Sequence, residues 1–191
     1  MEMGGHHVCP ASHAGLLDHP LRRLLHPPER ILGPYIRPGD TVIDIGCGSG
    51  FFTRPMARMV GDEGCVIAAD LQQGMLERLR VRAGGEGVLG RIRLHRTSSD
   101  SLDLAALPPV DFALAFYVVH EVPDVRRFFR EVAAALRPGG MMLVVEPVFH
   151  VGEGEFAETV RTAQGAGFLL EGAPRILFGR TALLRLPHAE G

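Results

Sequence analysis

The sequence predicts an α/β protein in which helices cover both faces of a doubly wound, mostly parallel sheet, giving three layers. Three observations support this prediction. Strand-like and helix-like hydrophobic patterns alternate from residue 41 onward, and a Gly-rich turn joins the first strand to the first helix of that alternation. The almost unbroken apolar run at 110–117 is typical of a central parallel strand that is buried on both faces. We expect about seven strands, with one antiparallel strand near the C-terminus.

Hydrophobic periodicity predicts seven strands and six helices along the chain. Strands are predicted at 41–45, 66–69, 91–96, 110–117 and 141–145, followed by an antiparallel pair at 168–171 and 175–186. Helices are predicted at 20–25, 29–36, 51–60, 72–83, 124–136 and 156–166. The helix after residue 124 has the clearest signals, because Asp124 suits its N-cap and the Pro and Gly residues at 137–140 stop it.

Length and composition limit the class of protein. The 191 residues are predicted to form a single domain over 1–191, with an N-terminal lid at 1–36 and a core at 37–187. The net charge of −2, with basic and acidic residues mixed, indicates no nucleic-acid partner. No apolar run is long enough to span a bilayer, and the first ten residues do not form a signal peptide. With three cysteines that lack disulfide spacing, we expect a cytoplasmic protein without a membrane partner.

The Gly-rich turn indicates which kind of ligand the first strand serves. Asp44 is followed by glycines at alternate positions, Gly46, Gly48 and Gly50, which allow a sharp turn and close approach of a ligand. A phosphate-binding P-loop needs a Lys here, and the chain contains none. A dinucleotide fingerprint needs a third small residue where Phe51 stands, and Asp44 would repel a pyrophosphate. S-adenosylmethionine fits better, because it has an ammonium and a sulfonium but no phosphate.

Residues 42–50 resemble the first motif of the class I S-adenosylmethionine-dependent methyltransferases, an acid followed by G-x-G-x-G. The Pro-Gly-Asp turn at 38–40 is also usual in that family, and the resemblance covers about residues 30–187. It is greatest to the small-molecule branch related to quinone-biosynthesis methyltransferases. The resemblance implies a Rossmann-like fold, S-adenosylmethionine as the cofactor and a small-molecule methyl acceptor.

The same resemblance implies roles for residues at the ends of the first two strands. In the family, the backbone at Gly46 and Gly48 lies against the methionine portion of the donor, and Asp44 reaches its amino group. Asp70 ends the second strand, where a carboxylate accepts hydrogen bonds from both ribose hydroxyls. Leu71 would then pack on the adenine face. The alternative for Asp70 is that it only caps the next helix.

The segment after the third strand departs from the family pattern. Relatives commonly have Gly-Asp-Ala there, with the acid on the adenine amino group, whereas Ser98 stands at the acid's place in this chain. Ser99 and Asp100 are the candidate contacts. Either Asp100 reaches the adenine through a shifted loop, or the contact is different, or the segment is a solvated polar loop.

The fourth strand leads into a segment that resembles the family's fourth motif, which often reads Leu-His-His-x-Pro-Asp. His120 matches the first His, and Glu121 replaces the second. The resemblance places the Phe116 carbonyl against the methionine amino group, and Tyr117 and His120 toward the methyl donor.

Methyl transfer from a sulfonium gains much of its rate from orientation and proximity, since the donor is already activated. A hydroxyl or thiol acceptor still needs to lose its proton, for which His is the usual base near neutral pH. His120 is the first candidate base and His150 the second. Glu146, at the end of the fifth strand, is expected at the same rim, and each His has the alternative of a structural role.

The sequence is also compatible with other functions. The alternatives are a nicotinamide-dependent oxidoreductase, which Asp44 and Phe51 disfavour, and a non-catalytic protein that binds the methyl donor or a metal. A metal could be held by His and Cys side chains near the N-terminus, at His6, His7, Cys9 and His13. No paired Cys motif supports a metal, so no metal is predicted.

Overall fold

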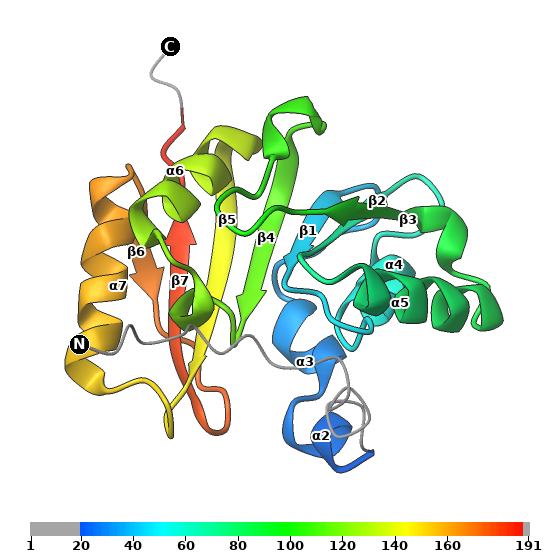
Figure 1. Ribbon diagram of the computed structural model, residues 1–191, viewed down its shortest axis with the longest axis horizontal. Helices are drawn as coiled ribbons and strands as arrows, with labels where there is room; N and C mark the ends of the chain where they lie inside the picture. Colours follow the sequence, from blue (N-terminus) through cyan, green and yellow to red (C-terminus); the bar gives the residue numbers. More distant parts are fainter. Residues whose placement is uncertain (1–19, 189–191) are drawn as a thin grey trace.

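The computed structural model describes residues 20–188 and has the predicted α/β architecture (Figure 1). Its seven-stranded sheet has the order β3-β2-β1-β4-β5-β7-β6. The strands are β1 Thr41–Ile45, β2 Cys65–Asp70, β3 Ile92–Arg96, β4 Val110–Phe116, β5 Leu136–Pro147, β6 Leu169–Gly172 and β7 Gly179–Arg185. The first five pair in parallel, and β7 runs antiparallel to both of its neighbours, β5 and β6. This confirms the mostly parallel sheet and the one reversed strand near the C-terminus.

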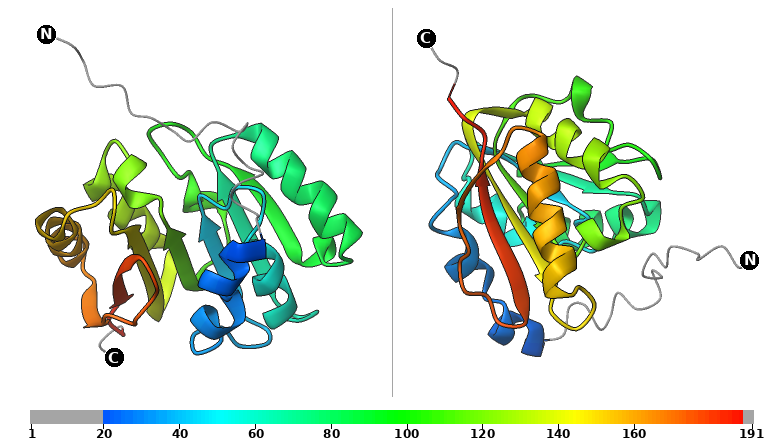
Figure 2. Two further views of the ribbon diagram at one scale, coloured as in Figure 1. Left: turned by 90° about the horizontal axis from the view of Figure 1, so that it is seen from below. Right: turned by 90° about the vertical axis from the view of Figure 1, so that its left-hand side faces the viewer.

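Helices cover both faces of the sheet (Figure 2). Side chains of α3, α4 and α5 form one core with inward residues of the sheet, and those of α6 and α7 form the core on the other face. The helices are α2 Pro20–Leu25, α3 Pro28–Leu32, α4 Thr53–Met59, α5 Gln73–Gly85, α6 Val125–Ala135 and α7 Glu153–Gly165. Within β1, Val42 belongs to the first core and Ile43 to the second, as the alternation of side chains along a strand requires.

The strand order reverses beside β1. This strand pairs with β2 on one side and with β4 on the other, so the two halves of the chain diverge at its carboxyl end. Open α/β sheets bind ligands at such a point, where the outgoing loops separate and leave a crevice. The Gly-rich turn lies at this switch point, directly after Ile45.

Four element boundaries differ by three residues or more from those predicted, and the first is the end of α3, which lies at Leu32 instead of residue 36. β5 begins at Leu136, which pairs with Val110, and the Pro-Gly-Gly segment is an irregular part of the strand across which the register shifts before Met141 pairs with Phe112. β7 begins only at Gly179, since the amide of Gly179 closes a turn onto the Ile176 carbonyl at 3.0 Å. The helix α7 begins at Glu153, in a polar first turn that a hydrophobic pattern does not detect.

The predicted lid is described only from residue 20 onward. Its helix α3 is anchored by Leu32, which is fully buried in the first core. The N-terminal His and Cys residues of the metal hypothesis, His6, His7, Cys9 and His13, lie outside the described residues. Among residues 20–188, no helix has the length and apolar character needed to cross a membrane.

Candidate active site

A cavity of about 610 Å³ lies at the carboxyl ends of the central strands. The structure brings every residue predicted to bind the donor or to act in catalysis into its wall. These residues are Asp44, Gly46, Gly48, Asp70, Leu71, Ser99, Asp100, Phe116, Tyr117, His120 and His150. The wall also includes His26, Phe149 and Phe178, which the sequence did not indicate.

The three glycines of the turn are needed for different structural reasons. All three have positive φ, with +68° at Gly46, +53° at Gly48 and +90° at Gly50. A Cβ at Gly46 would lie 2.2 Å from a methyl of Val118, and one at Gly50 would lie 2.2 Å from a methyl of Leu79. A Cβ at Gly48 would meet no atom within 4 Å. Gly46 and Gly50 therefore permit close packing, whereas Gly48 leaves open space beside the backbone.

This difference predicts unequal costs for alanine substitutions in the turn. Gly48→Ala is expected to lower the free energy of unfolding by about 1–2 kcal/mol, the cost of a Cβ at positive φ. Gly46→Ala adds a clash with Val118 and is expected to cost about 1–3 kcal/mol more. Urea unfolding of the two variants measures both values. Equal losses of stability would contradict the assigned packing role of Gly46.

Asp44 and Asp70 stand beneath the turn as buried carboxylates. Asp44 accepts a hydrogen bond of 2.5 Å from the Thr53 hydroxyl, which links β1 to the first turn of α4. Asp70 is 8% exposed and accepts bonds of 2.8 Å from the Gly48 amide and from the Gln72 amide. Burial raises the pKa of Asp70, and these two amide bonds partly oppose that effect. Its carboxylate retains lone pairs for further donors such as hydroxyls.

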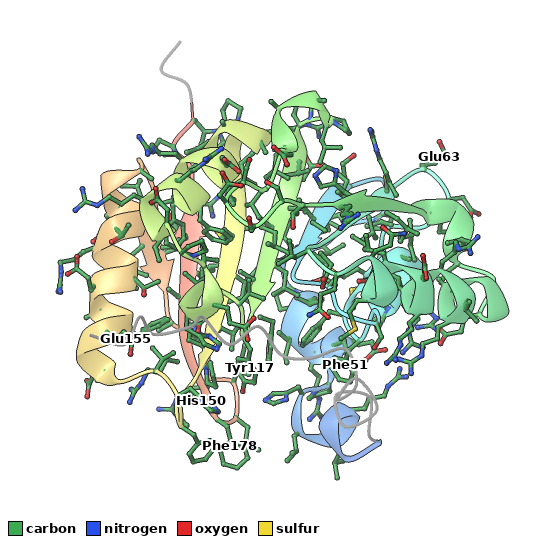
Figure 3. The ribbon with its side chains drawn as sticks, viewed as in Figure 1. Phe51, Glu63, Tyr117, His150, Glu155 and Phe178 are labelled. Carbon is green, nitrogen blue, oxygen red and sulfur yellow. The ribbon has the colours of Figure 1, made fainter. Side chains whose placement is uncertain are left out.

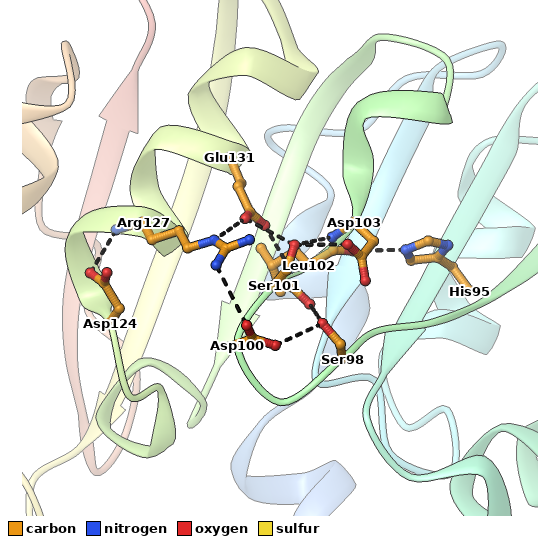
Figure 4. Close-up of polar contacts among 9 residues, drawn as sticks. All are labelled: His95, Ser98, Asp100, Ser101, Leu102, Asp103, Asp124, Arg127 and Glu131. Atoms are coloured by element: carbon orange, nitrogen blue, oxygen red, sulfur yellow. Dashed lines mark hydrogen bonds and ion pairs between the residues drawn. The ribbon is translucent and has the colours of Figure 1, made fainter.

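A polar loop forms the cavity wall after β3 (Figure 4). The Asp100 carboxylate is 73% exposed, 3.6 Å from an Arg127 nitrogen and 3.3 Å from the Ser98 hydroxyl. Ser98, at the place of the family's acid, thus bonds to the acid that stands two residues later. The loop brings Ser99 and Asp100 to the cavity, and their contact with a base remains a prediction.

His120, in the cavity wall after β4, is paired with a buried carboxylate. Glu146 is 1% exposed, and its Oε2 bonds to Nδ1 of the His120 ring. Its Oε1 accepts the amides of Val118 at 3.2 Å and Val119 at 2.8 Å. The Glu146 carboxylate accepts a hydrogen bond from Nδ1, so in the neutral ring Nε2 of His120 presents a lone pair. The bond to Glu146 raises the pKa of His120, against the opposing effect of burial.

Two further groups stand near the His120 ring. The Glu121 carboxylate lies 4.0 Å from its Nε2, and burial raises the pKa of Glu121. The His150 ring is nearly parallel to it, with ring centroids 6.4 Å apart, and lies at the rim of the cavity (Figure 3). Sequence reasoning placed Glu146 at this rim but missed its pairing with His120. The sequence signal for this pairing was the position of Glu146, an acid at the end of a buried strand.

The mouth of the cavity joins three separate parts of the chain. Tyr117 has a positive φ of 64°, and its hydroxyl lies 3.3 Å from the Phe178 carbonyl and 3.4 Å from Nε2 of His26. The same His26 nitrogen bonds to the Leu177 carbonyl at 2.8 Å. The Tyr117 hydroxyl therefore supports the β6–β7 loop, and its catalytic role remains a prediction. The aromatic rings of Phe149 and Phe178 pack on each other at this mouth, with centroids 5.5 Å apart.

No metal centre is formed by the part of the chain that the structure describes, since residues 20–188 contain no group of three or more suitable His, Cys, Asp or Glu side chains. Cys47 is buried beneath the turn, and burial, followed by the charges of Asp44 and Asp70, raises the pKa of its thiol. A raised pKa disfavours the thiolate that metal binding or nucleophilic attack requires.

Comparison with known proteins places this geometry in a family. Residues 42–140 match the family described as "Methyltransferase domain". The ubiquinone/menaquinone biosynthesis C-methyltransferase of Vibrio campbellii is 32% identical over 110 residues, which cover 58% of this chain and 42% of that protein. The protein of the same name from Teredinibacter turnerae is 34% identical over 111 residues, 58% of this chain and 44% of its own. The match thus spans less than half the length of these relatives.

Solved structures share the fold at lower sequence identity. A SAM-dependent methyltransferase from Aquifex aeolicus is similar over 93% of this chain and 98% of its own, with a TM-score of 0.81 and 22% identity. The [4+2]-cyclase SpnF is similar over 84% of this chain and 80% of its own, with a TM-score of 0.70 and 15% identity. The fold alone thus accommodates more than one chemistry. The family match over more than half of the chain is more specific: the chain belongs to the family described as "Methyltransferase domain".

Proposed function

We propose that this protein methylates a small acceptor from which His120 removes a proton. The observation that carries the proposal is the Glu146–His120 pair, which shares one cavity with the Gly-rich turn and Asp70. A bond forms between the acceptor atom and the methyl carbon while the bond from that carbon to sulfur breaks. Its electron pair stays on sulfur and leaves neutral S-adenosylhomocysteine, and the acceptor's proton passes to Nε2 of His120.

The donor is proposed to lie across the switch point with its methionine end on the Gly-rich turn. Gly48 leaves open space beside its backbone, so an extended ligand can approach there. The buried Asp44 carboxylate and the Phe116 carbonyl at the end of β4 suit the donor's ammonium. This orientation directs the sulfonium toward the half of the cavity that contains Tyr117 and His120.

The nucleoside end is proposed to extend toward β2 and β3. Asp70 has lone pairs for the ribose hydroxyls beyond the two amides that it already accepts. Leu71 follows it in the cavity wall and offers an apolar surface to the adenine. Ser99 and Asp100 border the same end, because β3 lies next to β2 in the sheet.

A phenol or quinol is the proposed acceptor class. The mouth of the cavity is lined by aromatic rings, those of Tyr117, Phe149, His150 and Phe178, which suit a planar ring. The matched relatives carry names that refer to ubiquinone and menaquinone biosynthesis. Deprotonation of a ring hydroxyl by His120 would raise the electron density of the ring for attack through carbon or oxygen. His150 remains the second candidate base at the rim.

We further propose the domain organisation expected from the sequence, a single domain with an N-terminal lid segment at 1–36 and a core at 37–187. The structure supports this at His26, which connects the segment between α2 and α3 to the β6–β7 loop. A cytoplasmic location and the lack of a nucleic-acid partner remain predictions from composition.

Release of S-adenosylhomocysteine across a panel of quinols, phenols, thiols and amines tests the proposal. We expect turnover with quinols or phenols, and loss of that turnover in His120→Ala. Turnover with thiols or amines alone would contradict the acceptor class. Donor binding without turnover on any acceptor would favour the alternative of a donor-binding protein without catalysis.

A further inference from the structure

One carboxylate of α6, that of Glu131 in the cavity wall, holds the loop at 97–103 (Figure 4). Oε2 of Glu131 accepts the Leu102 amide at 2.6 Å. Its Oε1 accepts the Ser101 hydroxyl at 3.0 Å and the Arg127 Nε at 2.7 Å. The Glu131 side chain is only 21% exposed, so solvent competes weakly for these bonds. The loop is therefore attached to α6 through its backbone and through a hydroxyl.

The helix that carries Glu131 is itself fixed in the core. Phe128, Phe129 and Val132 are buried against the sheet, and the Asp124 side chain caps the helix by accepting the Arg127 amide at 2.9 Å. The position of Glu131 is thus set by packing on the sheet. Its hydrogen bonds to Ser101 and Leu102 therefore fix the loop relative to the sheet.

The loop's other anchor is at the nucleoside end of the donor site. The Thr97 amide bonds to the Asp70 carbonyl at 3.1 Å, so the loop starts beside the carboxylate proposed to hold the ribose. At the far end, Asp103 has a positive φ of 53°, and its amide bonds to the Ser101 hydroxyl at 3.0 Å. Between these two points, Glu131 is attached at Ser101 and Leu102.

We propose that Glu131 is a positioning residue for recognition of the donor's adenine. The inference rests on the proposed donor orientation, which places the base against this loop. Ser98 stands where the family's base-binding acid is expected, so the base meets the loop's backbone and hydroxyls or the carboxylate of Asp100. Both routes depend on Glu131. It holds the backbone and a hydroxyl of the loop directly, and it pairs with Arg127, which in turn pairs with Asp100.

Glu131→Gln tests the proposal with little change in size. A Gln side chain has one accepting oxygen, so it cannot serve both the Leu102 amide and the Ser101–Arg127 side. We expect the dissociation constant for S-adenosylhomocysteine, measured by calorimetry, to rise about tenfold. S-inosylhomocysteine lacks the adenine amino group. Its dissociation constant is expected to rise less than about threefold. A purely structural role would weaken both ligands equally.

Glu158→Gln is the matched control, since Glu158 also pairs with an Arg on its own helix, at 2.6 Å from Arg161, but is exposed and away from the cavity. It should leave both affinities unchanged. Ser101→Ala removes only the loop-side hydroxyl and provides a milder variant if Glu131→Gln does not fold, with an expected loss of about threefold for S-adenosylhomocysteine alone.

Two results would overturn the inference. One is an affinity of Glu131→Gln for S-adenosylhomocysteine within twofold of wild type, and the other is an equal loss for the adenine and hypoxanthine ligands. If Glu131→Gln does not fold, unchanged affinities in Ser101→Ala would overturn it in the same way. Failure of the wild-type protein to bind S-adenosylhomocysteine would instead contradict the proposed donor site itself, so the two failures are distinguishable.

Discussion

Glu146→Gln is expected to lower the rate of methyl transfer by about 100-fold or more at neutral pH. The amides of Val118 and Val119 require an acceptor, so the Gln oxygen would take the place of Oε1. The amide nitrogen would then face Nδ1 of His120 and donate to it. That bond selects the tautomer with hydrogen on Nε2, which can no longer accept a proton from the acceptor. Single-turnover rates at saturating donor, with the acceptor identified by the panel, measure the loss.

The pH dependence of the Glu146→Gln enzyme distinguishes a changed His120 from a general disruption of the active-site structure. The bond to Glu146 raises the pKa of His120, so the ring stays protonated to higher pH than an ordinary His and the rate rises through that raised value. In Glu146→Gln the pKa of His120 falls, so the rising limb moves to lower pH while the plateau drops. An NMR titration of the His120 ring reports the same shift without any acceptor.

Glu155→Gln is the control for this experiment. Glu155 has only a through-space charge effect on His120 and makes no hydrogen bond to it. The plateau rate of the Glu155→Gln enzyme should therefore remain near that of wild type. A Glu146→Gln enzyme with the wild-type rate and the wild-type pH limb would remove the pair from the mechanism.

Asp70→Ala is expected to weaken binding of S-adenosylhomocysteine by about 10-fold to 100-fold. With the proposed donor orientation, the substitution removes the acceptor of two ribose hydroxyls, and it also frees the Gly48 amide that positions the turn. Calorimetric titration of the variant measures the loss directly. Asp62→Ala is a suitable control, since Asp62 is an exposed carboxylate that pairs with Arg91 at 2.6 Å and does not line the cavity.

Donor affinity in the wild-type protein should also depend on pH through Asp70. Burial raises the pKa of Asp70, so its carboxylate takes up a proton at higher pH than an ordinary Asp as the solution is acidified. A protonated Asp70 loses accepting capacity, and affinity should therefore fall as pH decreases through that raised value. Unchanged affinity in Asp70→Ala at every pH would contradict the ribose-binding role.

Local physics explains how much of this fold could be predicted from the sequence. The order of strands and helices follows from hydrophobic periodicity, which neighbouring residues determine. The turn at Gly46, Gly48 and Gly50 was predictable because positive φ strongly favours glycine. The boundaries of β5 and β7 were not, since Leu136 pairs with the distant Val110, and Gly179 pairs with Pro147 only after its amide has closed the turn onto Ile176.

The parts of the site that sequence reasoning missed depend on contacts between distant residues. His26 meets the Leu177 carbonyl across 151 positions, and Glu131 meets the Leu102 amide across 29. Glu146 and His120 are separated by 26 positions, although both follow strands whose ends must meet at the same edge of the sheet. Only that last pair had a signal in the sequence, through the parallel pairing of β4 and β5.

The central claim is that the cavity at the switch point is a site for S-adenosylmethionine. Calorimetric titration of the full chain with S-adenosylhomocysteine and, separately, with NADH tests this claim most directly. We predict one-to-one binding of S-adenosylhomocysteine and no binding of NADH, because Asp44 disfavours a pyrophosphate and Phe51 occupies the third fingerprint position. Binding of NADH without binding of S-adenosylhomocysteine would contradict the claim.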